Sequence, residues 1–121
     1  DAGAVEATRA NAGRAGVLDD LAVQQAALSA VEPPAGARGW LVTNPPYGKR
    51  VGDAEALRGL WARLGQLAEQ QLPGWTLGVL APDARLAGTI ESALGAPLDV
   101  ALATTNGGLS VAVLRGVVGA A

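Results

Sequence analysis

Short apolar runs alternate with amphipathic stretches through the second half of the chain, and this order restricts the fold more than any other feature. Trp40–Thr43 and Trp75–Leu80 are β-prone runs without polar alternation, so we expect strands buried on both faces. Between them, apolar residues recur at spacings of three and four from Leu57 to Ala68, which predicts a helix that begins after Asp53. A shorter helix is expected from Pro82 on.

The end of the chain predicts a hairpin. Leu98–Thr104 and Leu109–Arg115 are two further strand-like runs, and Asn106-Gly107 lies between them. Asn-Gly is a strong turn signal because both residues tolerate positive φ. Together with the alternating strands and helices, the hairpin predicts an α/β fold. Its sheet would be mostly parallel, covered on both faces and completed by a C-terminal antiparallel hairpin.

The first third of the chain is less regular. Ala2–Ala15 contains good helix formers, and Gly16 stands at the stop position. Leu21–Gln25 alternates enough to predict a strand, and Glu32–Gly39, with its two prolines and two glycines, predicts a loop. The strands at Trp40, Trp75, Leu98 and Leu109 are expected to form a four-stranded half-sheet, and Leu21–Gln25 is expected to lack a neighbour.

Composition limits the available chemistry. The 121 residues include no His and no Cys, which excludes imidazole bases, thiol nucleophiles and the usual zinc sites, and we predict no metal centre. Nine basic and eleven acidic residues give a net charge of -2, so a broad electrostatic grip on a polyanion is not expected. Because no apolar run is long enough to cross a bilayer and no signal layout opens the chain, we expect a cytoplasmic protein without membrane contact.

One tetrapeptide, Asn44-Pro45-Pro46-Tyr47, directly follows a predicted strand. Ligands of parallel α/β sheets bind beyond the carboxyl ends of strands, so this is where a reactive site belongs. The two prolines fix two φ angles and hold Asn44 extended. The plainer interpretation is a rigid loop with no further role.

The tetrapeptide suits an exocyclic amino group. The Asn44 side-chain oxygen and the Pro45 carbonyl can accept its two N–H protons, while Tyr47 stacks on the ring that carries it. The amine is then held in a nucleophilic geometry without any titrating base. Gly48, Lys49 and Arg50 follow, and their charges either contact a phosphate of the substrate or are simply solvated.

These residues resemble the class I S-adenosylmethionine-dependent amino-group methyltransferases, whose sheet is Rossmann-like. The likeness includes Gly39–Thr43 before the tetrapeptide and Gly48–Gly52 after it. It is strongest to the bacterial methylases of guanine N2 in large-subunit ribosomal RNA, which often carry an N-terminal THUMP domain. Leu60–Gly65, Pro73-Gly74-Trp75, Asp1, Ala10-Asn11-Ala12 and Ala15-Gly16-Val17 extend it over nearly the whole chain.

The resemblance implies an RNA methylase that uses S-adenosylmethionine. Asn44, Pro45, Pro46 and Tyr47 match the catalytic loop, with Asn44 a possible cofactor contact, and Tyr47 to Arg50 would meet the base and its phosphate. The glycine-rich cofactor loop has no counterpart here, and no carboxylate stands near Ala26-Ala27 for the cofactor's adenine. With Asp1 as the first residue and no Met in the sequence, we expect residues 1–121 to be part of a methyltransferase domain.

Two kinds of alternative remain at this stage. Adenine N6 and the amide of a protein glutamine also present an NH2 group, so the same loop serves either. The chain is otherwise an inactive RNA-binding or assembly module, which the absence of a carboxylate near Ala27 favours.

Overall fold

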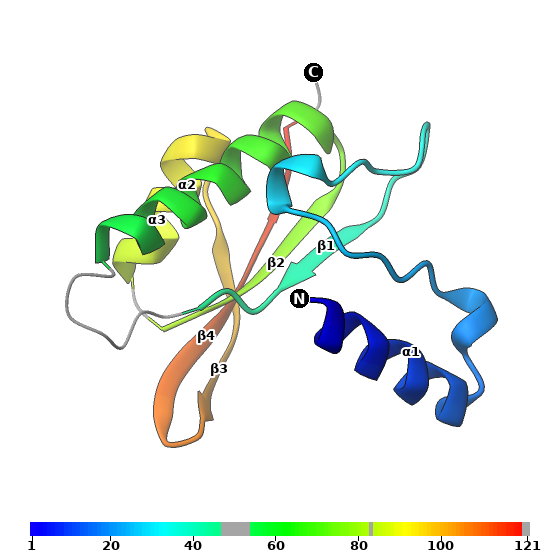
Figure 1. Cartoon of the computed structure of the whole chain (residues 1–121). Helices are drawn as coiled ribbons and strands as arrows, with labels where there is room; N and C mark the ends of the chain where they lie inside the picture. The colour runs from blue at the N-terminus through cyan, green and yellow to red at the C-terminus, as the bar shows by residue number, and fades with distance from the viewer. Residues whose placement is uncertain (47–53, 83, 120–121) are drawn as a thin grey trace. The chain divides into compact units, whose positions relative to one another are not determined.

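The computed structural model describes residues 1–46, 54–82 and 84–119, which belong to two compact units, Asp1–Val31 and Glu32–Ala121 (Figure 1). The larger unit holds the predicted strands and helices in the predicted order. Its elements are β1 (Trp40–Thr43), α2 (Ala54–Gln71), β2 (Thr76–Ala81), α3 (Ala84–Leu94), β3 (Asp99–Asn106) and β4 (Leu109–Val117).

The four strands form one sheet in the order β1-β2-β4-β3. β1 and β2 are parallel, and Thr43 pairs with Val79, so both strands end at the same edge of the sheet. β4 runs antiparallel to both β2 and β3. This confirms the α/β class, the half-sheet and the reversed hairpin at the end of the chain.

The core lies between one face of this sheet and helices α2 and α3, which pack on each other (Figure 1). Trp61 and Ile90 are the largest helical side chains that are fully buried, and Leu77 and Val79 of β2 are buried equally. Gly65 permits the close helix contact, because a Cβ there would lie 2.8 Å from the Ala93 Cβ. The spacing of three and four in α2 therefore marked the face that the helix buries.

The expectation of burial on both faces was wrong for β1, whereas in β2 the consecutive residues Leu77, Gly78 and Val79 are all buried. Trp40 and Val42 of β1 are 60% and 73% exposed, and Val117 on the same face is 64% exposed. β1 is an edge strand of the described sheet. Its side chains alternate between exposed and partly buried positions, because α2 and α3 cover only one face. An apolar run without alternation therefore did not reveal which of its faces is covered.

The hairpin turn lies one residue later than expected. Asn106 still belongs to β3 and pairs with Leu109, so the two turn residues are Gly107 and Gly108. Their φ values are 58° and 82°. Glycine reaches positive φ without the Cβ penalty that asparagine carries, which explains why Gly-Gly forms the turn.

The smaller unit contains α1 (Ala2–Ala15) followed by two short 3-10 helices, η1 (Leu18–Asp20) and η2 (Leu28–Ala30). The Asp1 carboxylate caps α1 by accepting from the Gly3 and Ala4 N–H groups, and Gly16 ends it at φ 74°. The predicted strand at Leu21–Gln25 is not formed. No strand of the described residues pairs with it, and without a partner its backbone has no ladder to join.

None of the helices in the described part of the chain is long and apolar enough to cross a membrane.

Candidate active site

Asn44, Pro45 and Pro46 follow β1 directly and form what we call the Asn44 loop (residues 44–46). Since β1 and β2 are parallel, this loop starts at the carboxyl edge of the pair, where a ligand site of such a sheet is expected. Asn44 and Pro46 are exposed, whereas Pro45 is buried. The loop thus inserts one proline into the fold and presents the Asn44 amide at the surface.

Trp61 holds the loop in place. Its indole N–H donates to the Pro46 carbonyl over 3.3 Å, while the side chain itself is completely buried in α2. The hydrogen bond satisfies a polar group that burial would otherwise leave unpaired. The loop is therefore tied to the core of the larger unit, which restricts where the two acceptors beside Pro46 can lie.

Four of the residues expected at the site, Tyr47, Gly48, Lys49 and Arg50, lie outside the described residues. Their expected roles in stacking and phosphate contact stay predictions.

Other residues considered from the sequence have plainer roles. Asp19 and Asp20 form the exposed helix η1, and Asp1 is engaged as the cap of α1. Asn106 ends β3 at the hairpin. Among the described residues, no cluster of three His, Cys, Asp or Glu could hold a metal ion.

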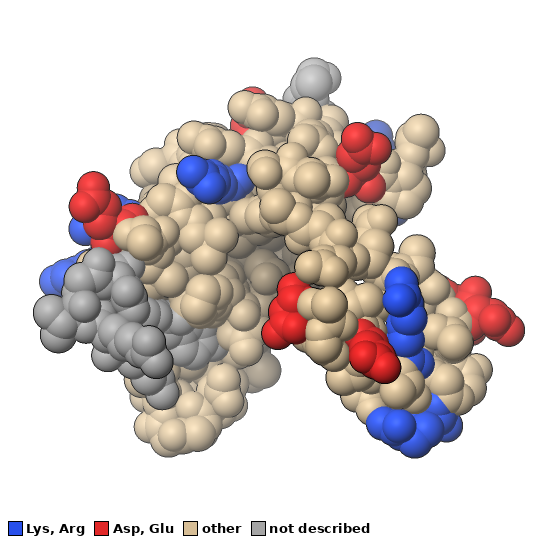
Figure 2. Space-filling view, in the orientation of Figure 1, with Lys and Arg blue, Asp and Glu red and all other residues tan. Residues whose placement is uncertain are grey.

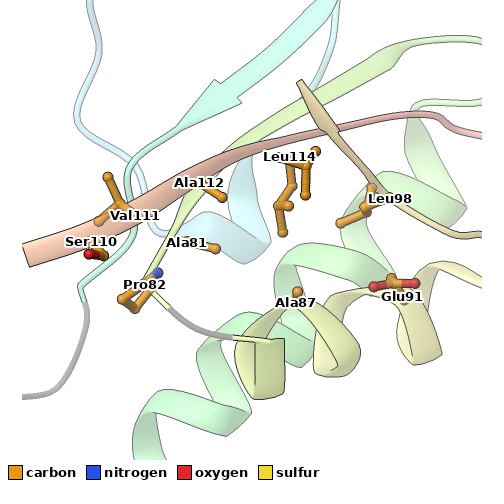
Figure 3. Close-up of a pocket in the computed structure, with 10 residues that line it drawn as sticks. Ala81, Pro82, Ala87, Glu91, Leu98, Ser110, Val111, Ala112 and Leu114 are labelled. Carbon is orange, nitrogen blue, oxygen red and sulfur yellow. The ribbon is translucent and has the colours of Figure 1, made fainter. Parts of the chain in front are cut away.

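A cavity of about 440 Å³ opens between α3 and the hairpin (Figure 3). Glu91 of α3 and Ser110 of β4 supply its polar side-chain groups, and the rest of its wall is apolar. Ala81 and Pro82 place one end of the cavity next to the end of β2 (Figure 3). None of the Asn44 loop residues is among the described residues that line this cavity.

Charged side chains are dispersed over the face of the molecule that Figure 2 shows. Figure 2 shows most of one face as uncharged, with basic and acidic side chains scattered over it. This distribution agrees with the net charge of -2.

Comparison with known proteins decides the family. Residues 1–106 match the family model described as RMKL-like, methyltransferase domain. The chain belongs to this family. It is also 38% identical over 112 residues to the ribosomal RNA large subunit methyltransferase K/L of Shewanella sp. (strain MR-4). That match covers 93% of this chain and 15% of the Shewanella protein, so the chain spans a small part of its relative.

Solved structures of similar fold agree. SMU.472, whose crystal structure contains SAH, superimposes with a TM-score of 0.80 at 28% identity, over 97% of this chain and 29% of that one. A predicted N6-adenine-specific DNA methylase from Listeria monocytogenes gives a TM-score of 0.69 at 25% identity, over 93% of this chain and 28% of that one. The family and the Rossmann-like methyltransferase fold expected from the sequence are therefore confirmed.

Sequence reasoning missed what Trp61 does. It placed Trp61 in the core, which is confirmed, but did not foresee the hydrogen bond to Pro46. A signal was present, since a buried indole N–H needs an acceptor and the loop precedes the same helix. Trp75 was also expected in the core, yet it is only half-buried, because it precedes β2 at the amino end of the sheet.

Proposed function

We propose that the full-length protein transfers a methyl group from S-adenosylmethionine to an exocyclic amino group of a base in RNA, guanine N2 of ribosomal RNA in particular. The position of the Asn44 loop carries this proposal. It follows a strand of a methyltransferase fold and is fixed to the core by Trp61. Membership of the RMKL-like family and the Shewanella relative's name support the RNA substrate. The site of action would be the cytoplasm, where ribosomal RNA lies.

The chain's own residues would act on the amine. The Asn44 side-chain oxygen and the Pro45 carbonyl accept one N–H each, which turns the nitrogen lone pair away from the base ring. Tyr47 stacks on that ring, and Lys49 and Arg50 meet the phosphate beside it. A base engaged in pairing would first have to leave its stack to reach this loop.

S-adenosylmethionine supplies the methyl group as an electrophile. The described residues include acceptors for the amine that receives the methyl group, but few groups that would bind the cofactor. The glycine-rich cofactor loop has no counterpart in the sequence, and Ala26 and Ala27 offer no carboxylate for the adenine. We therefore propose that the main cofactor contacts and an N-terminal THUMP domain are contributed by residues outside 1–121. The greater length of the relatives supports this.

The test is a methylation assay with the full-length protein, S-adenosylmethionine labelled in its methyl group, and ribosomal RNA transcribed in vitro. Mass spectrometry of the nucleosides identifies the product. We expect N2-methylguanosine in the wild-type reaction. Asn44→Ala should lower kcat by about a hundredfold or more, because misplacing a reacting group by 1 Å has an effect of that size. The affinity for RNA should stay within about twofold, since Asn44 aligns the amine and does not grip phosphate.

The matched control is Asn106→Ala, which removes an exposed amide from the hairpin of the same sheet. It should leave kcat unchanged. An Asn44→Ala protein with near wild-type turnover would overturn the role of the loop. N6-methyladenosine as the product, the activity that the Listeria neighbour's description names, would replace guanine by adenine. Absence of transfer to any RNA would favour the inactive module.

A further inference from the structure

A second cavity lies at the opposite end of β1 from the Asn44 loop. Its volume is about 360 Å³, within the usual range of small-ligand pockets of about 300–1,000 Å³. The loop before β1, the end of α2 and the residue before β2 form its wall. The side chains that matter are Pro33, Pro34, Arg38, Gln71, Pro73 and Trp75. Together they supply an aromatic ring, a guanidinium and an amide, and none of the described residues of the wall carries a carboxylate.

The ring of Trp75 is held in a fixed position at this cavity. Its indole N–H donates to the Ala37 carbonyl over 2.8 Å. Gly39 packs against the ring so closely that a Cβ there would lie 3.0 Å from Cζ3 of Trp75. Trp75 itself lines the cavity, whereas Gly39 is not among the described residues of its wall. A half-buried aromatic ring positioned in advance is suited to stacking.

Arg38 supplies the charge. Its guanidinium lies beside Gly74, where the Arg38 Nε is 3.2 Å from the position that a Cβ would take. Gly74 has φ 82°, a conformation that favours glycine, and the missing side chain leaves room for the arginine. A planar guanidinium binds phosphate through two parallel hydrogen bonds.

We propose that this cavity binds one unpaired nucleotide of the RNA substrate, with the base on Trp75, its edge near the Gln71 amide and its phosphate on Arg38. The inference rests on the proposed function, because it names a second contact for the same RNA. A nucleotide has a flat base and an anionic phosphate. The base matches the Trp75 ring and the proline side chains, and the phosphate matches the Arg38 guanidinium.

The position relative to the Asn44 loop fits one continuous strand of RNA. Arg38 and Asn44 are six residues apart along a segment that includes the whole of β1. An extended chain of that length spans at most about 20 Å. A few nucleotides of single-stranded RNA cover this distance, so a base at the Asn44 loop and a nucleotide at Trp75 can belong to the same strand.

The test measures binding of a fluorescein-labelled single-stranded RNA to the full-length protein by anisotropy at several KCl concentrations. Arg38→Gln should weaken binding about fivefold and lower the slope of log K against log salt by about 0.7, the share of one phosphate contact. Arg63→Gln removes the same charge from an exposed position of α2 away from the cavity and should change neither quantity. Trp75→Leu should weaken binding about tenfold through lost stacking.

A cross-linking experiment does not depend on how well Trp75→Leu folds. RNA that carries 4-thiouridine, irradiated on the wild-type protein, should attach to the peptide segments that contain residues 33–38 or 71–75. Equal binding by the Arg38→Gln and Arg63→Gln proteins, or cross-links confined to other segments, would overturn the proposal. So would displacement of the RNA by a glutamate-rich peptide that binds the wild-type protein more tightly, because the cavity would then be a peptide site.

Failure of the proposed function gives a different pattern. If RNA binding depends on Arg38 but the wild-type protein transfers no methyl group to RNA, the nucleotide site stands and the enzymatic proposal falls. If the wild-type protein methylates RNA and the Arg38→Gln protein binds RNA normally, the enzymatic proposal stands and the nucleotide site falls.

Discussion

The two loops that flank β1 are each held by a tryptophan, but in different surroundings. At the carboxyl end, the Trp61 indole N–H donates to Pro46 from a completely buried position over 3.3 Å. At the amino end, the Trp75 indole N–H donates to Ala37 over 2.8 Å from a half-buried position. Both bonds join a ring to the backbone of a proline-containing loop.

The two hydrogen bonds are alike in their donor and acceptor groups, but the free-energy cost of losing each one depends on its burial. A hydrogen bond lost in the core leaves a polar group that water cannot reach, whereas one lost near the surface is largely replaced by water. Trp61 also fills core volume, so its bond fixes the Asn44 loop against a rigid body. Trp75 fixes its loop and remains accessible to a ligand. Trp61 thus holds the Asn44 loop from within the core, whereas Trp75 is the ring on which we propose that a base stacks.

The largest effect is expected at Trp61. Trp61→Phe should lower the free energy of unfolding by about 2 kcal/mol, because it leaves a partial cavity and removes the bond to Pro46. It should also lower kcat about tenfold or more, since the Asn44 loop is no longer fixed. Urea denaturation and the methylation assay measure the two quantities. Leu64→Ala, a nearby core variant with 4% exposure in the wild type, should lose similar stability and keep kcat. Equal kcat for both variants would remove the support role.

A smaller effect is expected at Trp75. Trp75→Phe keeps a ring and loses the bond to Ala37, which should cost about 1 kcal/mol of stability. At saturating RNA its kcat should equal that of the wild type, because the Asn44 loop lies at the other end of β1. A drop in kcat as large as that of Trp61→Phe would show that the two loops do not act separately. Thermal unfolding and saturation kinetics make this comparison.

The smallest effect is expected at Gly39. A Cβ there would lie 3.0 Å from the Trp75 ring, which must move by a few tenths of an ångström, so Gly39→Ala should cost less than about 1 kcal/mol. RNA affinity should fall about twofold with it. Gly78→Ala is the control, since its Cβ would make an ordinary 3.7 Å contact with Val42. A stabilised Gly39→Ala protein would contradict the tight packing of the ring.

The sequence by itself determined the elements of the larger unit and their order. Helix spacing identified the buried face of α2, Gly16 marked the end of α1, and Asn-Gly between apolar runs identified the hairpin. The Asn44 loop was also found from the sequence, because two consecutive prolines after a strand are a local signal. Such signals depend on neighbours within a few residues, and the sequence contains those neighbours.

Only the tertiary structure decided which faces are covered and which distant groups meet. Val42 is apolar but exposed because its strand lies at an edge with helices on one side, and Leu21–Gln25 forms no strand because no described strand pairs with it. Trp61 reaches Pro46 across 15 residues and Trp75 reaches Ala37 across 38. Burial, strand pairing and these hydrogen bonds depend on contacts between segments far apart in the chain, so no local pattern of residues specifies them.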